Sequence, residues 1–151
     1  MYSSRVSGHV SAPPSAVYRA LTDADAVARW RVPEGMRSEV HEFDPREGGS
    51  FRVSLTYDLT YDAPDAVGKS TSRTDTYRGH FVRLVPDEQV VEVLEFETAD
   101  PALRGRTTMT TTLTATEGGT DVLIVHEGIP DAVPAADNEL GTRMALAGLA
   151  R

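Results

Sequence analysis

Residues 51–60 alternate strictly between apolar and polar side chains, and this pattern constrains the fold more than any other segment. The apolar positions are Phe51, Val53, Leu55, Tyr57 and Leu59, and the positions between them are Arg52, Ser54, Thr56, Asp58 and Thr60. Because successive side chains of a β-strand point to opposite faces, the pattern predicts a strand with one buried and one solvated face. An antiparallel sheet that faces the core on one side is therefore expected.

Six further strands are predicted from shorter patterns, at residues 6–10, 39–43, 77–85, 90–97, 106–116 and 122–127. Segment 90–97 carries apolar residues on both faces, which indicates a central strand. Gly79 lies inside a predicted strand and indicates a bulge or bend where the sheet curves. Residues 62–72 lose all periodicity and are predicted to form an exposed loop.

Helical periodicity occurs in two places. After Pro13 and Pro14 close the first strand, an apolar stripe continues to Trp30, and the capping sequence at residues 22–25 divides it into two short helices. The stretch after Pro134 is predicted to be one long helix. Its apolar stripe is formed by Leu140, Met144 and Ala147, with Leu146 and Leu149 beside it. The order of strand, two helices, six strands and helix indicates an α+β fold.

The composition excludes several classes of function. A chain of 151 residues corresponds to one domain with a core of its own. A net charge of −8 makes nucleic acid an unfavourable partner. With no cysteine, disulfides, thiolate nucleophiles and cysteine-ligated metals are excluded, and a cytoplasmic location is expected. No apolar run long enough for a membrane span occurs, and residues 1–5 lack the apolar core of a signal peptide.

Titratable residues form no catalytic or metal-binding motif. The four histidines, His9, His41, His80 and His126, fall on four different predicted strands. In the pair His126-Glu127 at most one side chain can face the core, because neighbours on a strand point to opposite faces. A solvated acidic face is expected for Glu92, Glu95 and Glu97, which we expect to pair with Arg78 and Arg83 of the preceding strand. No nucleophile elbow or phosphate-binding loop is present.

Five blocks in order, together spanning nearly the whole chain, resemble the signature blocks of a known family. They are APPSAVYRALTDADAVARW, VPEG, FDPREGGSFRV, YRGHFVRLVPDEQVVEVLEFE and DVLIVHEGIPD. They are similar to the START-like (SRPBCC) superfamily, and within it to the bacterial branch related to activators of the heat-shock protein 90 ATPase. The resemblance implies a single START-like domain over residues 1–151 with the helix-grip fold. In this fold a curved seven-stranded antiparallel sheet wraps around a long C-terminal helix, and two short helices follow the first strand.

One departure from the family pattern bears on the site. The family often carries a Trp in the terminal helix after an Asn-x-x-Gly run, and this chain has Thr142 after Asn138-Glu139-Leu140-Gly141. If that Trp helps to shape the cavity, the cavity of this chain differs from those of its relatives.

The resemblance further implies a cavity for an apolar or amphipathic molecule between the sheet and the last helix. Trp30 is expected near the mouth, and the hydroxyls of Tyr57, Tyr61 and Tyr77 are expected to orient the polar end of the ligand. A core filled by the same side chains is the alternative, because cores and pocket walls share their composition. The predicted ligand-binding residues are Trp30, Phe51, Val53, Leu55, Tyr57, Tyr77, Phe81, Phe96, Met109, Leu140 and Met144.

Three functions are compatible with the sequence. The first is binding of a small hydrophobic or amphipathic ligand without a cofactor. The second, implied by the family, is a partner module that stimulates a chaperone ATPase. The third is an enzyme resembling the polyketide cyclases of the superfamily, with His126 as acid or base. The sequence carries no signal for a particular ligand or oligomeric state.

Overall fold

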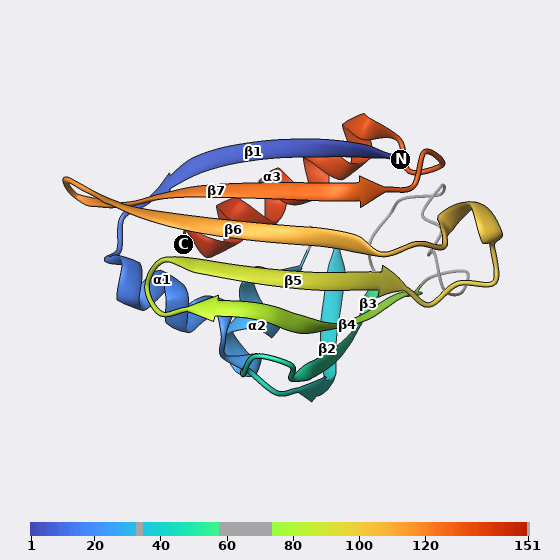
Figure 1. The fold of residues 1–151 in the computed structure, drawn as a ribbon, viewed down its shortest axis with the longest axis horizontal. Helices are drawn as coiled ribbons and strands as arrows, with labels where there is room; N and C mark the ends of the chain where they lie inside the picture. The colour runs from blue at the N-terminus through green and yellow to red at the C-terminus, as the bar shows by residue number, and fades with distance from the viewer. Residues whose placement is uncertain (33–34, 58–73, 151) are drawn as a thin grey trace.

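The structure is a computed structural model that describes residues 1–32, 35–57 and 74–150. Over these residues the chain forms one seven-stranded antiparallel sheet, three α-helices and a 3₁₀ turn (Figure 1). In chain order the elements are β1 (Tyr2–Val10), α1 (Pro14–Leu21), α2 (Ala24–Trp30), β2 (Met36–Phe43), β3 (Ser50–Tyr57), β4 (Thr74–Val85), β5 (Gln89–Phe96), η1 (Pro101–Leu103), β6 (Thr107–Thr116), β7 (Gly119–Ile129) and α3 (Ala135–Leu149).

The arrangement confirms the predicted α+β fold. The strand order is β1-β7-β6-β5-β4-β3-β2, and α3 runs along one face of the curved sheet behind β1, β7 and β6 in Figure 1. This is the helix-grip arrangement. The predicted division of the first helical segment is also confirmed, because α2 starts at a cap in which the Asp23 side chain accepts from the Asp25 amide.

The alternation in β3 places its side chains as predicted. Phe51 and Val53 are buried against α1, α2 and the neighbouring strands, and Phe51 contacts the rings of Tyr77 and Phe81. On the opposite face Arg52 donates to Glu97 at 3.0 Å. That hydrogen bond lowers the pKa of Glu97, and the charge of Arg52 acts in the same direction. The predicted continuation of the strand through residues 58–60, and the predicted loop at 62–72, lie outside the described residues.

Strand β5 is the fourth of seven strands, so its predicted central position is confirmed. A register shift between Phe81 and Arg83 marks a bulge in β4, close to the bend predicted from Gly79. A Cβ on Gly79 would lie 1.9 Å from the carbonyl oxygen of Val93, so only glycine permits this approach of β4 to β5.

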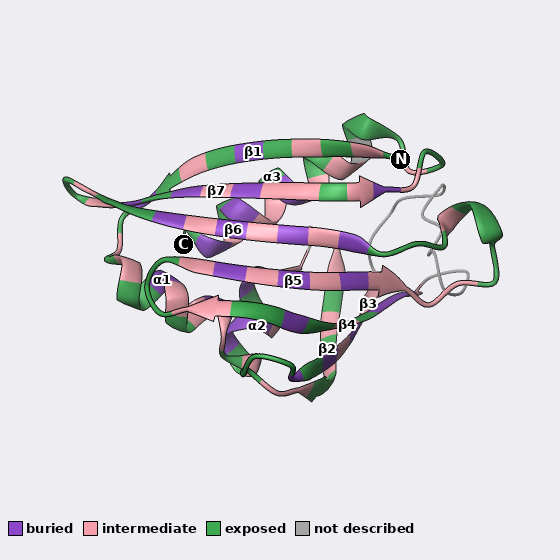
Figure 2. Cartoon of the chain, in the orientation of Figure 1, coloured by how far each residue is buried: buried purple, intermediate pink, exposed green. Residues whose placement is uncertain are grey.

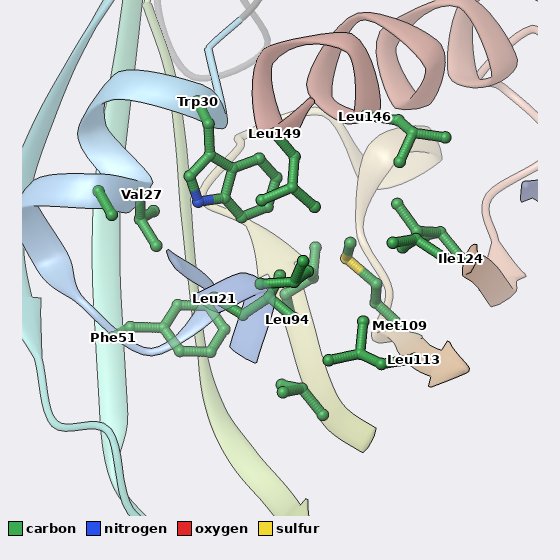
Figure 3. Packing of buried hydrophobic residues seen from close by; sticks show 14 of the residues in the cluster. Leu21, Val27, Trp30, Phe51, Leu94, Met109, Leu113, Ile124, Leu146 and Leu149 are labelled. Atoms are coloured by element: carbon green, nitrogen blue, oxygen red, sulfur yellow. The ribbon is translucent and has the colours of Figure 1, made fainter. Parts of the chain in front are cut away.

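Side chains from the sheet, α1, α2 and the C-terminal half of α3 pack into the main core (Figure 2). Trp30 is central to it: the indole is 5% exposed, and its Nε1 donates to the carbonyl of Ala20 at 2.7 Å. Figure 3 shows the indole against Leu149 of α3, with Leu146 next to Ile124 of β7. The end of the sheet that α1 and α2 cover is therefore filled by large side chains.

The prediction of which face of α3 packs against the fold is wrong, because the buried face is rotated by part of a turn from the predicted one. Leu140 is 55% exposed, and Ala147 is also exposed, whereas Thr142, Leu146 and Leu149 are buried. The predicted stripe follows side-chain size, whereas α3 packs through Leu146 and Leu149, and the glycines Gly148 of α3 and Gly8 of β1 let the helix approach the rest of the fold closely. A Cβ on Gly148 would lie 2.4 Å from the carbonyl oxygen of Trp30, and one on Gly8 of β1 would meet Leu146 at 2.7 Å.

Two glycines of α3 allow a matched test of this packing. Alanine raises helix stability over glycine by about 1 kcal/mol in an exposed helix interior. Gly141→Ala should therefore stabilise the protein by about 0.5–1 kcal/mol, since nothing lies within 4 Å of the new Cβ. Gly148→Ala should instead destabilise it by about 1–2 kcal/mol, because the backbone of Trp30 must move away. Urea unfolding of both variants measures the difference, and equal effects would mean that α3 does not press on Trp30.

Candidate functional site

A cavity of about 300 Å³ lies between the sheet and the N-terminal half of α3. It adjoins the main core, with which it shares Tyr77, Leu94, Met109 and Ile124, and it extends toward η1 and the segment after β7 at the right of Figure 1. The walls are mostly apolar. The described residues that line it are Arg31, Leu55, Asp75, Tyr77, Leu94, Phe96, Leu103, Gly105, Thr107, Met109, Ile124, His126, Ile129, Pro130, Ala132, Val133, Pro134, Asn138, Gly141, Thr142 and Ala145.

The wall contributed by α3 explains why this end of the fold is hollow. Asn138, Gly141, Thr142 and Ala145 face the cavity, and a Cβ on Gly141 would meet no atom within 4 Å. Thr142 donates its hydroxyl to the carbonyl of Asn138 at 2.8 Å and is turned onto its own helix. Because these four residues are small, the helix covers the sheet here without filling the space beneath it.

Arg31, which lines the cavity, belongs to a buried ion pair. Arg31, the residue after α2, donates from Nη1 to Oε1 of Glu92 on β5 at 2.9 Å, and these side chains are 15% and 4% exposed. Its Nη2 lies 3.1 Å from the sulfur of Met109, and its Cζ lies 5.2 Å from the centroid of the Tyr77 ring. Burial alone would lower the pKa of Arg31, but the Glu92 carboxylate raises it above its usual value, so Arg31 stays charged. The charge is thus held by a carboxylate, a thioether and an aromatic face.

Two further polar groups of the lining lack a hydrogen-bond partner. They are the hydroxyl of Tyr77 on β4 and Nδ1 of His126 on β7, and each atom is buried. A buried polar atom without a partner costs about 1–3 kcal/mol relative to a satisfied one. Groups of this kind in an apolar cavity are available to a bound molecule.

Both groups are neutral at neutral pH. Burial, and then the positive charge of Arg31, lowers the pKa of His126 to about 4. Burial raises the pKa of Tyr77, and Glu92 adds to this while Arg31 opposes it. The imidazole and the phenol can therefore each donate one hydrogen bond and accept another.

The predicted site residues separate into three groups. Leu55, Tyr77, Phe96 and Met109 line the cavity together. Trp30, Phe51, Val53 and Phe81 lie in the main core, so Trp30 is not near the mouth as expected. Leu140 is exposed and Met144 is half-buried, and neither is among the described lining residues. The side chain of Tyr57 and all of Tyr61 lie outside the described residues.

The expected acidic face needs one correction. Arg78 does pair with Glu95, at 3.3 Å, and approaches Glu97 to 3.9 Å. Glu92 is instead buried on the opposite face with Arg31. Glu92 lies two residues from Val90 and two residues from Leu94, and both of these are buried. Since residues two apart on a strand share a face, this spacing is the signal that would have placed Glu92 inside. Arg31 has no comparable signal, because its partner lies 61 residues away.

The histidines lie as the strand pattern predicts. His126 faces the cavity while Glu127 is exposed, which agrees with the expectation that only one of them points inward. His9 is exposed beside Asp121 at 3.2 Å, and His41 contacts Ser54 at 2.8 Å on the outer face. Residues 1–32, 35–57 and 74–150 contain no group of three or more histidine, aspartate or glutamate side chains placed to hold a metal ion. None of the helices in these ranges is long and apolar enough to cross a membrane.

Comparisons with known proteins agree with this architecture. The family model described as "Activator of Hsp90 ATPase homolog 1-like protein" matches residues 11–151. A crystal structure of a Chromobacterium violaceum protein is 32% identical over 99% of this chain and 96% of that chain, with a TM-score of 0.85. A Rhodobacter sphaeroides protein is 22% identical over 99% and 90%, with a TM-score of 0.79. The solution structure of an AHSA1-like protein from Aeromonas hydrophila is 17% identical over 99% and 90%, with a TM-score of 0.74, and shows the same fold. No curated protein matches the chain.

Proposed function

This chain belongs to the family of Activator of Hsp90 ATPase homolog 1-like proteins, and from that premise we propose that it binds a small amphipathic molecule between the sheet and α3. The observation that carries the proposal is the cavity of about 300 Å³, in which apolar walls surround a few polar groups. Ligand sites have this composition, because apolar surface supplies affinity and the polar groups fix orientation.

The size of the cavity limits the ligand. A volume of about 300 Å³ is at the lower end of the range of ligand pockets, about 300–1,000 Å³. We propose a molecule of two or three fused or linked rings, or an aliphatic one of similar bulk. Leu55, Phe96 and Met109 supply apolar wall from three different strands, so the ligand body would lie across the sheet.

Gly141 offers a test that leaves the main core untouched. Gly141→Leu places a side chain of four carbons in the empty space beneath α3. We expect the affinity for N-phenyl-1-naphthylamine, an uncharged probe that fluoresces in apolar surroundings, to fall at least tenfold, because the variant side chain occupies the volume of the probe. Fluorescence titration of purified protein at constant probe concentration measures the dissociation constant.

Ala147→Leu is the matched control, since it adds an apolar side chain to the exposed face of the same helix. It should bind the probe as the parent protein does. Equal probe binding by all three proteins, or no binding by the parent protein, would contradict the proposal. Native mass spectrometry of protein taken directly from cells adds an independent observation, namely the mass of a retained ligand that Gly141→Leu should lack.

The family description favours a second proposal, stimulation of a chaperone ATPase. We propose it as an alternative, with a cytoplasmic location as its natural setting. The hydrolysis rate of a purified heat-shock protein 90 with and without this protein tests it. An unchanged rate over a concentration series that spans the micromolar range would reject it, and Gly141→Leu shows whether any stimulation depends on the cavity.

A further inference from the structure

The polar groups around the cavity define the chemistry of the molecule that it accepts, and this inference rests on the proposed ligand-binding function. Three groups decide the question: the Arg31–Glu92 ion pair, the hydroxyl of Tyr77 and Nδ1 of His126. The first is already satisfied, and the other two are not.

A carboxylate or phosphate finds no unpaired cation among the described residues of the lining. Among the described residues of the lining, Arg31 is the only one with a permanently cationic side chain, and Glu92 already occupies it at 2.9 Å. An anionic ligand would have to displace Glu92, which would leave a carboxylate 4% exposed without its partner. Asp75 also lines the cavity and adds a further acidic group. The lining therefore disfavours anions.

A cationic ligand is disfavoured by the other member of the pair. The guanidinium of Arg31 lies over the ring of Tyr77, 5.2 Å from its centroid, so the aromatic face that would attract an ammonium group is taken. Together with burial, the charge of Arg31 lowers the pKa of His126 and so favours the uncharged imidazole. A second positive charge would be repelled from the same region.

Two neutral polar groups of the described lining remain without a hydrogen-bond partner, and they lie at two separate places. Tyr77 lies on β4 and His126 on β7, with β5 and β6 between them, so the two groups approach the cavity from different sides. Each can donate or accept, and each is buried without a partner. Hydroxyl and carbonyl oxygens complement both.

We propose that the cavity selects an uncharged polycyclic or aromatic compound with hydroxyl or carbonyl oxygens, and that Tyr77 and His126 hydrogen-bond to those oxygens. The apolar rings would lie against Phe96 and Met109, and anionic relatives of the same skeleton are disfavoured because Glu92 already pairs with Arg31. Tyr77 and His126 are thus the residues that determine specificity.

Four probes with one skeleton test this proposal: naphthalene, 2-naphthol, 2,6-dihydroxynaphthalene and 2-naphthoate. Each is titrated by displacement of N-phenyl-1-naphthylamine at pH 7.5. One added hydrogen bond to a buried neutral group corresponds to about a fivefold to tenfold gain in affinity. We expect 2-naphthol to bind at least fivefold more tightly than naphthalene, the diol to bind no less tightly than 2-naphthol, and 2-naphthoate to bind more weakly than naphthalene.

Two variants assign the hydrogen bonds. Tyr77→Phe removes only the hydroxyl and His126→Leu removes both ring nitrogens, and neither leaves a new buried polar group, so both should fold. In at least one of them the ratio of the affinity for 2-naphthol to that for naphthalene, both measured on the same variant, should fall below two. Tyr18→Phe, at a tyrosine outside the described lining, is the matched control and should keep the full advantage.

The outcomes separate this inference from the proposed function. If naphthalene and N-phenyl-1-naphthylamine do not bind, the proposed function fails together with the inference. If they bind but the hydroxyl adds nothing, 2-naphthoate binds most tightly, or the hydroxyl advantage survives in both variants, the cavity binds ligands but the inference is overturned.

Discussion

Glu92→Leu should lower the free energy of unfolding by about 3 kcal/mol or more, because it leaves the guanidinium of Arg31 in the interior without its carboxylate. Breaking a buried ion pair by removing one partner costs about 3–5 kcal/mol, of which most is the desolvation of the charge that remains. Within the described part of the chain, Arg31 keeps the thioether of Met109 and the ring of Tyr77 as neighbours, and neither replaces an anion. Urea unfolding followed by far-UV circular dichroism measures the change.

Two comparisons identify the cause of that loss. In the double variant Arg31→Met with Glu92→Leu neither charge of the pair remains, so most of the stability should return. Glu139→Leu breaks the exposed pair between Glu139 and Arg143, which are 2.8 Å apart on α3, and should change stability by less than about 0.5 kcal/mol. A loss for Glu92→Leu as small as that for Glu139→Leu would show that Arg31 is not held in the interior by its charge partner.

Acidification should destabilise the protein through His126. The pKa of this imidazole is lowered to about 4 by burial and by Arg31, whereas it is about 6.5 in an unfolded chain. Between these values the unfolded chain binds a proton that the folded chain does not, so the free energy of unfolding falls as the pH drops. The full stability contribution is present above pH 6.5, and about 3 kcal/mol of it is lost by pH 4.

His126→Leu isolates this contribution from that of the carboxylates, which also titrate in the acidic range. Unfolding free energies of both proteins, measured at half-unit steps from pH 7.5 to pH 4, give a difference curve. The curve should be flat above pH 7 and should then change by about 3 kcal/mol in favour of the variant as the pH falls. Parallel profiles for the two proteins would mean that the imidazole is solvated in the folded state.

The faces of the sheet were predictable because period two is a strong signal. Phe51 and Val53 are buried and Arg52 is paired on the outer face, as the alternation predicted. The same rule applied to β5 would have placed Glu92 inside with Val90 and Leu94, but the three nearby glutamates suggested a common acidic face. The predicted exposure of Glu92 was therefore wrong because it followed the local charge and not the spacing along the strand.

The cavity was harder to predict from the sequence than the faces of the sheet. Leu140 and Met144 have the size and spacing of a contact stripe, yet α3 packs on the fold through Leu146, Gly148 and Leu149 and turns Gly141 and Ala145 toward the cavity. Hydrophobic periodicity detects large apolar residues and is silent about small ones, so the rotation of this helix could not be read from it. Arg31 was missed because the pair with Glu92 is a contact between distant parts of the chain.

The pairing of β1 with β7 bears on how the protein is made. Tyr2 of β1 lies opposite Ile129 of β7, so β1 finds its neighbour only after β2 to β7 have been synthesised. Contacts of such sequence separation slow folding to the range of milliseconds to seconds, because a long loop must close before they form. During synthesis β1 therefore waits without its partner strand, and it is the segment that a chaperone would need to shield from other nascent chains.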